Sequence, residues 1–149
     1  MPLKIPDKVK VFIDADVLVA GIASPSEHST SQVILRLAEI TLIEAMTSHQ
    51  VICEVERNLQ DKLPKAIPVF QLLVQRCLQI VADPDPENLK INEGFANPKD
   101  LPILVAALMS SCKWLVTFNL RHYSPGHPQI QVAETGNFIR HIRQQLSNL

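Results

Sequence analysis

Short apolar runs rich in β-branched residues alternate along this chain with longer segments of helical period. The runs that predict strands lie at 9–14, 42–47, 80–82, 114–118 and 130–132. This alternation is typical of α/β domains, in which a mainly parallel sheet has helices on both faces. A length of 149 residues with 46% hydrophobic content suits one domain with its own core, so we expect a single domain over residues 1–149.

Helical periodicity fills most of the sequence between these runs. Helices are predicted at 17–22, 31–40, 48–63, 66–79, 99–111 and 135–149, and residues 88–97 are predicted as a loop. Asp16 is expected to cap the first helix and Ser48 the third, because Asp and Ser are favoured N-cap residues. Asp100 stands at the start of the helix "KDLPILVAALMSS", whose first turn tolerates Pro102.

Composition narrows the functional classes. A formal net charge of -1 provides no basic excess, so contact with phosphate would need a local basic patch or a metal ion. The sequence contains no run of eighteen apolar residues, so no membrane helix is predicted. The first residues lack a signal-peptide pattern. The three separated cysteines, Cys53, Cys77 and Cys112, predict buried free thiols and therefore a reducing cytoplasm.

Polar residues stand where strands are predicted to end. Asp14 ends the first run, and Thr117 and Asn119 end the run at 114–118. A helix that returns the chain to this run starts at the carboxyl edge of the sheet, so Asp100 can share that edge. Each residue also has an ordinary role: Asp14 in a turn, Asp16 as a cap, Asp100 as a first-turn acid, Asn119 as a turn former. The convergence of all of them is what indicates a site.

Further acids lie on the helix at 48–63. Glu54 and Glu56 flank Val55, the centre of its apolar stripe, and either could reach over the sheet edge or be solvated. Carboxylates that converge repel one another unless a cation completes the site. Oxygen ligands without a Cys/His set favour Mg²⁺ or Mn²⁺ over zinc.

Four segments in order resemble the motifs of the PIN-domain ribonucleases, a family that includes toxin subunits of bacterial toxin–antitoxin pairs. They are "VFIDADVLVAGI", "TSHQVICEVERNL", "NPKDLPILVAAL" and "WLVTFNLRHY", and the resemblance covers about residues 9 to 135. It implies a three-layer α/β/α sandwich with a central, mainly parallel five-stranded sheet. It also implies metal-dependent endonuclease cleavage of single-stranded or structured RNA, an antitoxin protein as partner, and a homodimer or higher oligomer.

The resemblance assigns roles to residues. Asp14, Glu54 and Asp100 would be catalytic, metal-binding acids, with Asn119 at the fourth ligand position, and the family pattern selects Glu54 over Glu56. That fourth position commonly carries aspartate in the family, so the site would hold three formal negative charges and bind metal more weakly.

Other residues would support the site. Thr117 would stabilise it from behind the ligands, and Asp16 is a reserve ligand that could compensate for the missing fourth charge. Basic residues near the motifs would contact RNA phosphates, although ordinary surface charge is their simpler interpretation. They are Lys99, Arg121, Arg57 and His122.

Two other functions stay open. A PIN-like domain could bind nucleic acid or protein without cutting, which Asn119 and the lack of basic excess both favour. "FIDADV" also resembles haloacid dehalogenase-like phosphatases, with Asp14 as nucleophile, Asp16 as acid/base and Thr117 in their second motif. That family also needs a downstream lysine and a paired acidic motif, and "IQVAET" offers no paired acids.

Overall fold

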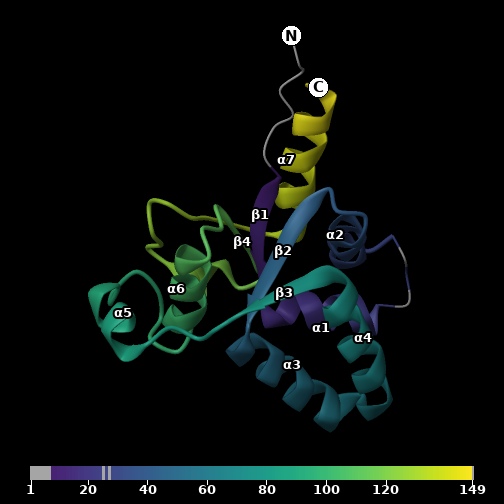
Figure 1. The fold of residues 1–149 in the computed structure, drawn as a ribbon, viewed down its shortest axis with the longest axis horizontal. Coiled ribbons are helices and arrows are strands. Elements are labelled where there is room, and N and C mark those ends of the chain that lie inside the picture. The colour runs from purple at the N-terminus through teal and green to yellow at the C-terminus, as the bar shows by residue number, and fades with distance from the viewer. Residues whose placement is uncertain (1–7, 25, 27, 149) are drawn as a thin grey trace.

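The computed structural model describes residues 8–24, 26 and 28–148. Five strands form one sheet: β1 (Val9–Ile13), β2 (Ile43–Ser48), β3 (Leu78–Val81), β4 (Trp114–Val116) and β5 (Gln131–Ala133). They lie in the order β3-β2-β1-β4-β5, and every pairing is parallel (Figure 1). The predicted α/β fold with a five-stranded parallel sheet is confirmed.

In the described residues, seven α-helices connect and follow the strands. They are α1 (Ala15–Ala23), α2 (Thr30–Glu39), α3 (His49–Lys62), α4 (Ile67–Cys77), α5 (Pro86–Ile91), α6 (Leu101–Met109) and α7 (Thr135–Ser147). Short 3₁₀ turns cover Pro64–Ala66 and Leu120–Tyr123.

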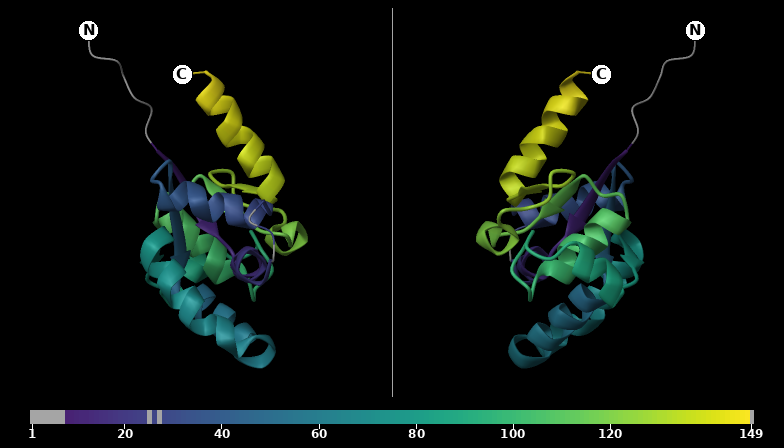
Figure 2. Two further views of the ribbon diagram at one scale, coloured as in Figure 1. Left: turned by 90° about the vertical axis from the view of Figure 1, so that its right-hand side faces the viewer. Right: turned by 90° about the vertical axis from the view of Figure 1, so that its left-hand side faces the viewer.

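The direction of the connections reverses at β1. The chain moves outward from β1 to β2 and β3, then crosses back to β4 and β5 on the other side of β1. Because parallel crossovers are right-handed, this reversal places the connecting helices on opposite faces of the sheet. α6 packs on one face against β2 and β4, and α2 packs on the other against β2, α1 and α7 (Figures 1 and 2). The three layers agree with the expected sandwich.

Strand β1 lies at the centre of the core. Val11, Phe12 and Ile13 are fully buried in succession, because helices cover both faces of a parallel sheet. Leu104 of α6 and Phe138 of α7 are also fully buried, one from each helix layer. The residues after β1 are thus attached to a strand end that is fully buried in the core.

Three local expectations were wrong. Asp14, not Asp16, is the N-cap of α1, which begins two residues earlier than predicted. The predicted loop at 88–97 contains most of helix α5, capped by Asp85. All three cysteines are free as predicted, but only Cys112 is buried, whereas Cys53 and Cys77 are half-buried on their helices. Within the described residues, no helix is long and apolar enough to cross a membrane.

Candidate functional site

The carboxyl ends of β1 and β4 are neighbours where the direction of the connections reverses. Asp14 follows β1 directly, and its backbone N–H donates to the carbonyl of Val116, the last residue of β4, over 3.1 Å. Thr117 follows Val116, and Asp100 is the N-cap residue of α6. Open α/β sheets bind ligands in the crevice at such a point.

Asp14 is a buried carboxylate with three donors. Its side chain is in a residue only 6% exposed. Its Oδ1 accepts from the Ala15 N–H at 2.8 Å, and its Oδ2 accepts from the Thr117 hydroxyl at 2.9 Å and the Tyr123 phenol at 2.7 Å. Charge-assisted bonds of this length compensate much of the cost of burying the charge, so the orientation of Asp14 is fixed.

Asp16 faces the same strand end from the first turn of α1. Its Oδ2 accepts from the Phe118 N–H at 2.9 Å, the Asn119 side-chain amide at 3.0 Å and the Thr117 hydroxyl at 3.3 Å. Its Oδ1 is buried and has no hydrogen-bond partner within the described part of the chain. Burial, and then the neighbouring charge of Asp14, raise the pKa of Asp16.

Asp100 reaches the edge from the start of α6. Its Oδ2 lies 3.3 Å from Nδ1 of His122, and its side chain is 17% exposed. Burial raises its pKa, with a further increase from the charge of Asp14, while His122 and Lys99 oppose the shift. The protein's own groups therefore only partly offset the cost of a negative charge on Asp16 and on Asp100.

Tyr123 joins the three aspartates and was not predicted. It is 2% exposed, and its phenol donates to Asp14. Burial raises its pKa most, followed by the charges of Asp14, Asp100 and Asp16, so the phenol stays protonated and remains a donor. The only sequence signal for it was a lone tyrosine, the single one in the chain, four residues after Asn119. Asp14, Asp16, Asp100 and Tyr123 are called the acid edge below.

Glu54 is not joined to the acid edge in this arrangement. It lies half-buried on α3, and its Oε1 accepts from the Gln50 side-chain amide one turn earlier, over 3.4 Å. Among residues 8–24, 26 and 28–148, no group of three or more His, Cys, Asp or Glu side chains is arranged to hold a metal ion. The four-residue ligand set therefore stays a prediction.

The other predicted residues fall into two groups. Thr117 and Asn119 contact the aspartates directly, and the Asn119 backbone N–H also donates to the Thr117 hydroxyl at 3.1 Å. The basic residues are all exposed at the surface: Lys99, Arg121, Arg57 and His122. Lys99 and His122 are near enough to Asp100 to lower its pKa, whereas no contact joins Arg57 or Arg121 to the acid edge in the described structure.

The chemistry of the acid edge fits a hard divalent cation. Asp16 Oδ1 is a buried carboxylate oxygen without a donor among the described residues, and burial, followed by the charge of Asp14, raises the pKa of both Asp16 and Asp100. A bound cation would give the Asp16 oxygen a partner. It would also lower the raised pKa of both aspartates. Mg²⁺ in particular is commonly held by one or two carboxylates and several waters, which suits a site with few protein ligands.

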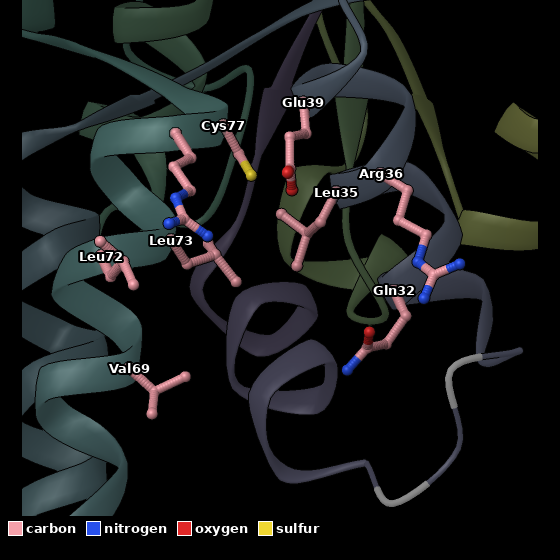
Figure 3. Close-up of a pocket in the computed structure, with 9 residues that line it drawn as sticks. Gln32, Leu35, Arg36, Glu39, Val69, Leu72, Leu73 and Cys77 are labelled. Carbon is pink, nitrogen blue, oxygen red and sulfur yellow. The ribbon is translucent and has the colours of Figure 1, made fainter.

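A pocket lies elsewhere, away from the acid edge. It has a volume of about 200 Å³ and lies between α2 and α4, and its lining includes Leu35, Val69, Leu72 and Cys77 together with charged residues (Figure 3). None of the acid-edge residues lines it. The convergent polar groups of the acid edge, rather than this pocket, therefore define the candidate site.

Comparison with known proteins agrees with the fold described above. A family model described as "PIN domain" matches residues 10–121. No curated protein matches the chain. Solved structures with a similar fold include VapBC2 from Rickettsia felis bound to a promoter DNA fragment, at 15% identity and a TM-score of 0.62, covering 85% of this chain and 98% of that one.

Two further structures show the same fold. PAE2754 from Pyrobaculum aerophilum has 14% identity and a TM-score of 0.63, covering 91% of this chain and 96% of that one. The Mycobacterium tuberculosis VapC20, described as a toxin that cleaves the sarcin–ricin loop, has 14% identity and a TM-score of 0.51, covering 70% of this chain and 86% of that one. At these identities the likeness concerns the fold.

Proposed function

This chain belongs to the PIN-domain family, and from that premise we propose that it is a metal-dependent endoribonuclease, built as a single PIN-like domain over residues 1–149. The observation that carries the proposal is the acid edge. Three aspartates converge where β1 and β4 end, and one of their buried oxygens, Asp16 Oδ1, has no partner in the described residues. This is where a fold of this kind binds its ligand.

Asp14, Asp16 and Asp100 would hold Mg²⁺ or Mn²⁺, and Glu54 and Asn119 are the further ligands that the family resemblance implies. When bound, such an ion lowers the pKa of a water molecule and neutralises charge on a scissile phosphate. We propose that Asp16 is a metal ligand rather than a reserve one, because its Oδ1 is buried without a partner in the described residues and its pKa is raised by burial and then by the charge of Asp14.

The protein's own groups fix the carboxylates. Thr117 and Tyr123 donate to one oxygen of Asp14 and Ala15 to the other, so that Asp14 cannot turn away from the edge. His122 holds Asp100 at 3.3 Å from the solvent side. Exposed cations would contact the RNA phosphates on either side of the cleaved bond and set the register of the strand. They are Lys99, Arg121, Arg57 and His122.

We propose an antitoxin protein as the partner of this chain, which would act as the toxin of a toxin–antitoxin pair, as a homodimer or higher oligomer in the cytoplasm. The support is the resemblance to toxin subunits and the shared fold with VapBC2 and VapC20. Since VapC20 is described as cleaving the sarcin–ricin loop, structured RNA belongs beside single-stranded RNA among the substrates to test.

The test is RNA cleavage by the purified full chain with Mg²⁺, Mn²⁺ or EDTA. Asp14→Asn removes the central charge and should lower metal-dependent cleavage by at least about 100-fold, because loss of groups that hold a metal site is that costly. Asp61→Asn makes the same chemical change at an exposed position of α3 and should leave the rate unchanged. Cleavage that persists in Asp14→Asn would show that a contaminant or another site cuts the RNA.

One observation favours a second function. The Asn119 amide donates to Asp16 and adds no charge, so the domain could bind RNA or protein without cutting. Calorimetric binding of Mn²⁺ with no shortening of RNA would support this binding module over the nuclease. The haloacid dehalogenase-like alternative has no support from the family match.

A further inference from the structure

An open hollow lies at the opposite edge of the sheet from the acid edge. It has a volume of about 1050 Å³ and spans the beginnings of β1, β4 and β5 together with the later turns of α7. In Figure 1 the beginning of β1 is its upper end, and α7 lies beside it. Its chemically distinctive lining residues are Lys8, Lys10, Lys113, Trp114, His127 and His141, and it is called the amino-edge hollow below.

The hollow is locally basic in a chain whose net charge is -1. Lys8, Lys10 and Lys113 line it, and among the described residues Glu44 is its one acidic lining residue. Glu44 pairs in register with Lys10 on the neighbouring strand, so its charge offsets Lys10 first. Lys8 and Lys113 are exposed, and in the described part of the chain neither forms an ion pair. Two ammonium groups are therefore available to an anion.

The wall beside the lysines is aromatic. The centroids of the Trp114 and His141 rings lie 4.6 Å apart, and the rings are tilted by 40°. The Phe138 ring packs edge-to-face with Trp114, with 5.5 Å between the ring centroids. Trp114 is 9% exposed and His141 is half-buried, so the ring positions are fixed by packing. Side-chain amides complete the lining: Gln129, Gln131 and Gln145. Planar rings and amides are the groups that proteins use to hold nucleobases.

We propose that the amino-edge hollow binds a phosphate-bearing nucleotide, either free or as the end of an RNA strand. Lys8 and Lys113 would hold the phosphate, and the half-buried His141 ring, with Trp114 packed against it, would hold the base together with the glutamines. The volume is at the upper end of the range for small-molecule sites, which leaves room for a nucleotide and water. The site is separate from the acid edge and does not depend on RNA cleavage.

Trp114 is the sole tryptophan of the chain, so the fluorescence of the protein can report binding at the hollow. AMP added to the full-length protein in EDTA should change the emission of Trp114, excited where AMP does not absorb, and give a saturable binding curve. Adenosine and inorganic phosphate should each bind at least about tenfold more weakly, because each lacks one of the two halves that the hollow recognises. A 5′-phosphorylated oligoadenylate separates the two sources: tighter binding than AMP identifies the end of a strand, and equal binding identifies the free nucleotide.

Variants locate the site. Lys8→Gln combined with Lys113→Gln should weaken AMP binding by about tenfold or more, whereas Lys62→Gln, at an exposed position of α3, should change it less than about twofold. Asp14→Asn should leave AMP binding unchanged, whether or not the chain cleaves RNA. The proposal is overturned if the double variant binds AMP like the wild type, if Lys62→Gln weakens binding equally, or if adenosine binds as tightly as AMP. Loss of AMP binding in Asp14→Asn would place the ligand at the acid edge and overturn it as well.

Discussion

At the scale of single residues, Tyr123 and Thr117 both donate a hydrogen bond to the same oxygen of Asp14. Both side chains are buried, and both donate to Oδ2. Hydrogen bonds to a buried carboxylate offset part of the free-energy cost of burying it. The positions of these two uncharged residues therefore determine how the Asp14 carboxylate is oriented.

Removal of the phenol tests this dependence. Tyr123→Phe keeps the ring and deletes the 2.7 Å bond to Asp14. We expect the free energy of unfolding to fall by about 1.5–3 kcal/mol, as for other hydrogen bonds to a charged group, measured by urea denaturation. Thr117→Val deletes the other donor and should cost a similar amount. An unchanged midpoint in both variants would mean that these bonds do not stabilise the fold.

Asn119 offers the converse experiment. Its amide donates to Asp16 over 3.0 Å, so Asn119→Asp would place a second carboxylate against the first. Without metal we expect a loss of roughly 1 kcal/mol in unfolding free energy, because like charges repel. With Mn²⁺ the melting temperature should rise more than in the wild type, because a further ligand is present. Asn137→Asp, at an exposed site on α7, is the control; a Mn²⁺ response as large as that of Asn119→Asp would argue against a site at Asp16.

Residue types predicted the position of the site better than its bonding. Asp14 and Asp16 are equally good caps, and a spacing of two residues does not tell which one begins the helix; the backbone of β1 decides, because it ends at Ile13. Tyr123 could not be predicted, because its contact with Asp14 joins residues 109 positions apart. Hydrophobic periodicity describes only neighbouring residues and cannot predict a contact across so many positions.

At the scale of elements, long amphipathic segments were predictable and short ones were not. α3 and α7 carry clear apolar stripes and begin where their sequences predict. α5 has only six residues and no buried side chain. A helix this short and exposed has no apolar stripe from which it could be predicted. Its signals are a capping Asp85 and a proline in the first turn, which also occur in ordinary turns.

The cap of α5 can be tested directly. Asp85 Oδ1 accepts from the Asn88 backbone N–H at 2.8 Å and from its side-chain amide at 2.9 Å. Asp85→Ala should destabilise this helix by about 1 kcal/mol, seen as faster hydrogen exchange of the amides of residues 88–91. Asp61→Ala, within exposed α3 surface, should leave these amides unchanged. Unaltered exchange in Asp85→Ala would show that packing against α6, rather than the cap, holds α5.

At the scale of the whole molecule, the two ends of the sheet carry opposite charge. The acid edge lies at the carboxyl ends of the strands, and the lysines of the amino-edge hollow lie at the other ends. The net charge of -1 hides this separation because the two regions nearly cancel. Strand order could not be predicted from periodicity, and the separation depends on it.

The acid edge also makes stability depend on pH in the absence of metal. Burial and Asp14 raise the folded-state pKa of Asp16 and Asp100 above the ordinary value of 3.8. The stability from these two acids is therefore complete below pH 3.8 and is lost as pH rises through their raised pKa. Urea denaturation in EDTA, from about pH 4 to about pH 7, should show wild type losing stability relative to Asp16→Asn and Asp100→Asn as pH increases. A pH-independent difference would contradict these shifts.

The pairing of β1 with β4 has a consequence for synthesis of the chain. Two of the three hydrogen bonds to the Asp14 side chain come from residues 103 and 109 positions later, and the third comes from the neighbouring Ala15. A nascent polypeptide on the ribosome thus contains the first aspartate long before it contains the donors that orient it. Until β4 and Tyr123 emerge and dock beside β1, the acid edge does not exist, and a growing chain cannot carry out the chemistry proposed for the finished one.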